Sequence, residues 1–76
     1  MNKIKPVHWK EFEKFVLAVG CVLKRKSGSH MIYDKEGLRR PVVFNRDTAL
    51  PVFIIVNNLK VLGVSKKEYL QKIINL

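Results

Sequence analysis

The chain has little of several things that define common classes of protein. Its single cysteine, Cys21, has no partner for an internal disulfide, which argues against a disulfide-stapled secreted domain and fits a reducing compartment. The longest apolar run, Val52 to Val56, is far too short to span a bilayer, and no such run follows the basic start of the chain. We therefore expect a cytoplasmic, soluble protein that makes no contact with a membrane.

The residues that build metal and catalytic sites are also scarce. Two histidines, one cysteine and six carboxylates lie scattered, with no spacing typical of a metal site. No glycine-rich phosphate loop, Ser-His-Asp set or paired-carboxylate site is visible. We expect no metal and no cofactor.

Acidic residues are outnumbered by basic ones. The chain has 15 Lys and Arg against 6 Asp and Glu, a formal net charge of +9 at pH 7. Such an excess attracts polyanions, whether RNA, DNA or an acidic protein. A basic surface that is merely well solvated is the alternative. Of the two interpretations, the excess of basic residues favours contact with nucleic acid.

The hydrophobic spacing predicts helices at both ends of the chain. One spans Val7 to Val19 and ends at Gly20, which supplies a left-handed residue. A second starts at Pro51, placed at the first helical position, and ends at Gly63. The β-branched run 51–56 favours a strand locally, but the length of the apolar stripe favours a helix. The stripes are Trp9, Phe12, Val16 and Val19, then Val52, Ile55, Val56, Leu59 and Leu62.

A short third helix is indicated after Gly63. Ser65 and Glu68 have the spacing of a capping box, in which each side chain bonds the other residue's backbone N–H. The apolar residues that follow give this helix its packing side, and they are Tyr69, Leu70, Ile73 and Ile74.

The middle of the chain predicts three antiparallel strands. We expect turns at Ser27-Gly28 and at 34–37, the latter of type I. Pro41 lacks a ladder donor and favours an edge position or a bulge. Alternation places Leu23 and Arg25 on one face of the first strand, and Lys24 on the other. The strands are Cys21–Lys26, Ser29–Asp34 and Leu38–Phe44, with Met31 and Tyr33 expected to face the core.

These elements predict an α+β fold in the order α-β-β-β-α-α. Helices would cover one face of a three-stranded antiparallel sheet. Seventy-six residues allow one small domain, 1–76, with a core of marginal size.

The stretch from Lys24 to Tyr33 is the candidate functional segment. Three cations lead into a Ser-Gly-Ser turn that delivers His30 onto a strand. An imidazole can move a proton near neutral pH, and cations stabilise phosphate charge. His30 is the candidate general acid or base, although an ordinary strand histidine is the competing interpretation. The candidate RNA contacts are Lys24, Arg25, Lys26, Gly28, Ser29, Arg39 and Arg40.

Gly28-Ser29-His30, entered from a basic strand and left through Ile32-Tyr33, resembles the signature of HicA-type toxins, which are small mRNA interferases of bacterial toxin–antitoxin pairs. The resemblance covers nearly the whole chain. Its other blocks are Val19-Gly20-Cys21, Leu50 to Ile55, Asn57-Asn58-Leu59 and Leu62 to Ser65.

The resemblance implies a fold like that of double-stranded-RNA-binding domains and a metal-independent endoribonuclease with His30 as catalytic residue. It also implies an acidic antitoxin similar to HicB proteins, and we expect the free toxin to be a monomer. Many members have Pro and a second His after the third strand, where this chain has Asn45-Arg46-Asp47. Two alternatives therefore stay open: a catalytically silent RNA-binding module of the same fold, and a basic protein that binds only an acidic partner.

Overall fold

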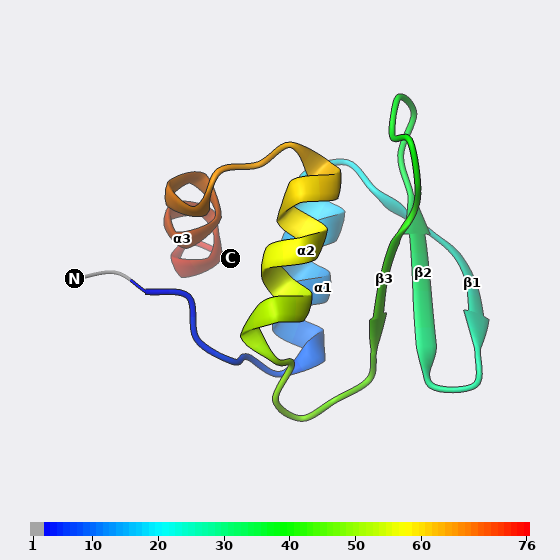
Figure 1. The fold of residues 1–76 in the computed structure, drawn as a ribbon, viewed down its shortest axis with the longest axis horizontal. Coiled ribbons are helices and arrows are strands. Elements are labelled where there is room, and N and C mark those ends of the chain that lie inside the picture. Colours follow the sequence, from blue (N-terminus) through cyan, green and yellow to red (C-terminus); the bar gives the residue numbers. More distant parts are fainter. Residues whose placement is uncertain (1–2) are drawn as a thin grey trace.

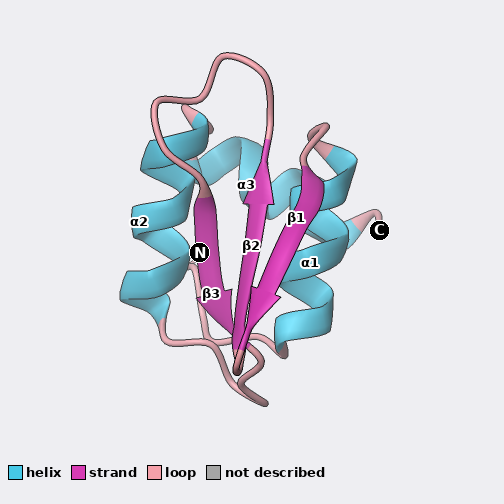
Figure 2. Ribbon diagram, turned by 90° about the vertical axis from the view of Figure 1, so that its right-hand side faces the viewer, coloured by secondary structure: helices cyan, strands magenta, loops and turns pink. Residues whose placement is uncertain are grey.

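The computed structural model describes residues 3–76, so the first two residues of the expected domain 1–76 lie outside the described part. Three strands form one antiparallel sheet in the order β1-β2-β3. The helices lie on one face of the sheet and leave the other face open (Figures 1 and 2). This confirms the α+β fold and the expected order of elements. Along the chain they are α1 (Trp9–Ala18), β1 (Val22–Ser27), β2 (His30–Asp34), β3 (Val42–Asn45), α2 (Val52–Leu62) and α3 (Lys66–Ile74).

Aromatic side chains make the centre of the core between the sheet and the helices. Met31 and Tyr33 are buried on the helix side of β2, as expected. The Phe44 ring stacks on Tyr33 with centroids 5.1 Å apart and meets the Phe12 ring edge-on at 5.1 Å. Offset and edge-on pairs of this kind add to the free energy gained from burying apolar area. Cys21 is buried among these residues as a small apolar group.

Both turns of the sheet differ by one residue from the prediction. Ser27 pairs with His30, so the first turn is Gly28-Ser29 and not Ser27-Gly28. Gly28 has φ +61° at the first central position, as a type II′ hairpin turn requires. In the second turn the Leu38 N–H donates to the Lys35 carbonyl over 3.1 Å. Gly37, with φ +91°, is therefore the third residue of that turn rather than the fourth.

The third strand is shorter than predicted. It begins at Val42 rather than at Leu38, since the turn around Gly37 and then Pro41 keep the intervening residues out of the ladder. β3 is an edge strand, and Pro41 comes directly before it.

A bulge in β1 overturns the alternation expected there. Leu23 pairs with Tyr33, and Arg25 pairs with Ile32, which leaves Lys24 as the extra residue. Paired residues of antiparallel strands share a face, so Leu23 lies on the helix side and Arg25 on the open side. The prediction that these two side chains share a face is wrong.

Helix α2 forms where the apolar stripe of the sequence predicted a helix, with two differences from the prediction. Pro51 is the N-cap rather than the first helical residue, and it has no side-chain cap hydrogen bond. The buried stripe also contains a polar residue, Asn58, which is 6% exposed. Its carboxamide accepts from the Val43 N–H over 3.3 Å and donates to the Val43 carbonyl over 3.0 Å. A helix side chain thereby occupies the outer edge of β3.

Helix α1 begins at Trp9, with His8 as its N-cap, rather than at the predicted Val7, because Val7 forms a bridge with Leu50. The other helix ends follow the sequence signals. Gly20, with φ +102°, ends α1, and Gly63, with φ +70°, ends α2. The capping box of Ser65 and Glu68 starts α3. In α3 only Tyr69 is buried, and Ile74 is 75% exposed, so Ile74 does not join the packing side predicted for it. No helix in residues 3–76 has the length and apolarity needed to cross a membrane.

Candidate functional site

His30 lies on the open face of the sheet, at the end where β1 turns into β2. It is exposed, while its neighbour Met31 faces the helices. The pairing of strands places Ser27 of β1 and Asn45 of β3 on either side of it. Arg25 lies on the same open face, opposite Ile32. A histidine ring there is accessible to a large ligand from the side that no helix covers (Figure 2).

Arg46 holds the turn that precedes His30. Its guanidinium donates to the Gly28 carbonyl over 3.0 Å, and its backbone N–H donates to the Ser29 carbonyl over 3.1 Å. Both carbonyls of the turn are thus bound by one residue. A Cβ at Gly28 would meet nothing within 4 Å, so the positive φ, and not crowding, requires glycine there. The open space above the turn leaves its backbone free to approach a ligand.

A groove of about 310 Å³ runs from His30 to the start of α2. Val43 and Asn45 line it from β3, Asp47 from the connection after β3, and Phe53 from α2. The segment between β3 and α2 is tied down from the N-terminal side of the chain. The Trp9 N–H donates to the Asp47 carbonyl over 3.0 Å, and the Leu50 N–H donates to the Val7 carbonyl over 2.8 Å.

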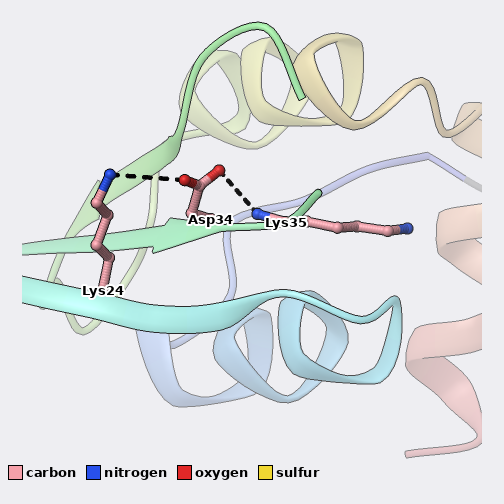
Figure 3. A network of polar contacts seen from close by, with 3 residues as sticks. All are labelled: Lys24, Asp34 and Lys35. Carbon is pink, nitrogen blue, oxygen red and sulfur yellow. Dashed lines mark hydrogen bonds and ion pairs between the residues drawn. The ribbon is translucent and has the colours of Figure 1, made fainter. Parts of the chain in front are cut away.

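The three cations of β1 are divided between the faces. Lys24 forms an ion pair with Asp34, with Nζ and Oδ2 3.6 Å apart, and the other oxygen of Asp34 accepts from the Lys35 N–H (Figure 3). This pair is solvent-exposed, so it contributes little to stability and leaves Lys24 available to phosphates. Lys26 pairs with Met31, which places it on the helix side, away from His30.

Arg39 and Arg40 lie away from His30. They belong to the connection after β2, at the opposite end of the sheet from the Gly28-Ser29 turn (Figure 1). Four residue steps of β2 separate His30 from Asp34, roughly 13 Å of extended chain. Both arginines line a separate groove with Lys60 of α2. They form a second cationic region and do not extend the cationic surface around His30.

Sequence reasoning missed Asn45, Arg46, Asp47 and Phe53 as neighbours of His30. Antiparallel pairing of the second and third strands would have indicated Asn45, but the hydrogen bonds of Arg46 depend on the shifted turn. Phe53 stood inside an apolar run and gave no separate signal.

Three groups of the core have pKa values shifted from their ordinary values. Burial, with the hydrogen bond from the Tyr33 hydroxyl to the Glu13 carboxylate, raises the pKa of Tyr33. Burial, followed by the charge of Glu11, raises the pKa of Tyr69 to about 12. Burial also raises the pKa of the Cys21 thiol, which makes Cys21 a poor nucleophile. Within residues 3–76, no three His, Cys, Asp or Glu side chains gather as a metal ion would require.

Fold and site together define a small cationic α+β protein with an accessible histidine on an uncovered sheet face. A family model described as the HicA toxin of bacterial toxin–antitoxin systems matches residues 9–63. The match includes α1, the whole sheet and α2. The chain therefore belongs to the HicA toxin family, whose members are paired with an antitoxin. No curated protein and no solved structure matches the chain.

Proposed function

We propose that this HicA-family toxin is a metal-independent endoribonuclease that cleaves mRNA, with His30 as its general acid or base. The observation that carries the proposal is the position of His30. Its imidazole is exposed on the helix-free face, beside a donor-rich turn and at the end of a groove. The net charge of +9 supplies the attraction for RNA.

Cleavage without a metal uses the ribose 2′-hydroxyl as nucleophile. The hydroxyl loses its proton and attacks phosphorus, and the bond to the 5′-oxygen breaks as that oxygen takes a proton from water. His30 takes the first proton as a general base. The Arg46 guanidinium, held near the turn, and the turn N–H groups stabilise the charge on the phosphorane. Arg25 and Lys24 contact the flanking phosphates from the open face.

The test compares the two histidines of the chain. We expect His30→Ala to cut cleavage of a single-stranded RNA by about 10²- to 10⁴-fold while RNA affinity persists, since the cations remain. His8→Asn is the matched control, because His8 caps α1 by accepting from the Lys10 N–H over 3.2 Å and Asn is a good N-cap. Cleavage should continue in excess EDTA. Cleavage by His30→Ala at the parent rate would refute the role of His30, and binding without any cleavage by the parent chain would identify a silent RNA-binding module.

We also propose that the antitoxin partner is acidic and inhibits by covering the Gly28-Ser29 turn and His30. Opposite charge speeds the encounter of such partners, and carboxylates can occupy the places of phosphates. The test adds a small acidic protein encoded by a neighbouring reading frame to the toxin and labelled RNA. Displacement of the RNA supports occlusion, whereas a ternary complex excludes it.

A further inference from the structure

The aromatic residues of this protein divide sharply by exposure. Of the seven Phe, Tyr and Trp residues, only Phe53 is exposed, with 64% of its surface accessible. It lies in the first turn of α2, whose buried stripe runs along another side of the helix. Leaving a large aromatic ring in water forgoes about 2 kcal/mol of burial free energy. Core packing therefore does not explain why this ring is here.

Phe53 lines the same groove as His30. The groove, of about 310 Å³, has room for one planar base but not for a duplex. Its wall is partly apolar, from Val43 and Pro51, and partly polar, from Asn45 and Asp47. A flat apolar ring with hydrogen-bonding groups around its edge matches this lining.

Charge separates the groove from the phosphate-binding surface. Asp47 lines the groove, and its negative charge disfavours a phosphate there and suits the amino group of a base. The phosphates are attracted instead to Arg46, which binds the turn next to His30, and to Arg25, which lies opposite Ile32 on the open face. A nucleotide whose phosphate lies at His30 would direct its base toward α2.

We propose that this groove holds one unpaired nucleobase, stacked on Phe53, next to the phosphate at which His30 acts as general acid or base. The inference rests on the proposed function, because it takes RNA as the substrate, and it specifies single-stranded RNA. A base inside a helix has both faces covered by its neighbours, so Phe53 can stack only on a base that is unpaired or at a strand end.

The test measures binding separately from cleavage. A fluorescein-labelled RNA of twelve nucleotides with 2′-O-methyl riboses has no free 2′-hydroxyl and stays intact. Its affinity is measured by anisotropy, alone and annealed to its complement. Stacking of a base on an aromatic side chain is worth about 1–3 kcal/mol, so Phe53→Ala should weaken single-strand binding by roughly 5- to 150-fold. Duplex binding should fall much less, because only the terminal pairs of the duplex expose a base face.

Matched variants isolate the aromatic plane. Phe53→Trp should bind the single strand as the parent does, and Phe53→Leu, which keeps an apolar side chain without a ring, should weaken it as Phe53→Ala does. Ile74→Ala, at a residue 75% exposed on α3, should have no effect. Circular dichroism of each variant checks that the fold is kept.

Three results would overturn the proposal: parent-like single-strand affinity in Phe53→Ala, an equal loss for single strand and duplex, or a loss confined to the acidic protein partner. A cleavage result on His30 does not enter this comparison. The general acid–base role can therefore fail while the base-binding groove stands, and the reverse.

Discussion

Asn58 of α2 closes the outer edge of β3, and its replacement gives the sharpest test of how this small fold is held together. Asn58→Ala removes both hydrogen bonds to the Val43 backbone and leaves that N–H and carbonyl without a protein partner. A net hydrogen bond contributes about 0.5–1.5 kcal/mol, so two contribute roughly 1–3 kcal/mol. Because Val43 is 37% exposed, water satisfies part of the loss, and we expect about 2 kcal/mol.

The neighbouring residue provides the control. Asn57 is exposed on the same helix, so Asn57→Ala makes the same gain in helix propensity without disturbing β3. Urea unfolding of the two variants should differ by about 2 kcal/mol, and their Tm values by roughly 8–16 °C for a domain of this size. Asn58→Ala should also self-associate as its concentration rises, since the β3 edge becomes free to pair. Equal stability of the two variants would show that the carboxamide does not hold the edge.

Three further predictions concern charge and the buried tyrosines. Arg25→Ala should reduce the slope of log affinity for RNA against log salt by about 1. Lys26→Ala should reduce this slope less, because of these two residues only Arg25 lies on the face of His30. A larger reduction in Lys26→Ala would place RNA on the helix side. The buried Tyr69 hydroxyl has no hydrogen-bond partner among the described residues. Tyr69→Phe should therefore leave the free energy of unfolding in urea unchanged or raise it by up to about 2 kcal/mol. A loss of stability would show that the hydroxyl is hydrogen-bonded. The raised pKa of Tyr33 stabilises the fold below the ordinary tyrosine pKa of 10.0 and less as pH rises beyond it, because the unfolded chain releases that proton first. The urea midpoint should therefore fall between pH 9 and 11 by less in Tyr33→Phe than in the parent, and equal falls would contradict the shift.

The elements that follow from local patterns were predictable. Helical stripes, the glycines that end α1 and α2, and the capping box of α3 all depend on residues within one or two turns of each other. The inward direction of Met31 and Tyr33 was expected, but alternation did not settle it, because Ile32 puts an apolar residue on the other face. His30 could also be singled out from local sequence, because it directly follows a Gly-Ser turn.

What the sequence could not indicate depends on partners far along the chain. The bulge at Lys24 is a relation between β1 and β2, and alternation within β1 alone hides it. Asn58 is a poor candidate for a helix core until its partner at Val43, 15 residues away, is known. Arg46 reaches back 18 residues to the Gly28 carbonyl. Residues of β2, β3 and α2 line the groove beside His30, so no single stretch of sequence contains all of them.

The two edges of the sheet are protected by different means. At β3 the protection is built into the fold, because a helix side chain occupies the backbone groups. At β1 every residue is exposed, and what keeps a second copy away is the repulsion of Lys24, Arg25 and Lys26, helped by the bulge. Such protection is conditional, since any polyanion that neutralises these cations also removes it. Experiments that neutralise the three cations therefore alter the colloidal behaviour of the chain along with its affinity for RNA, and exchanging Arg for Lys or Lys for Arg, which keeps the charge, separates the two effects.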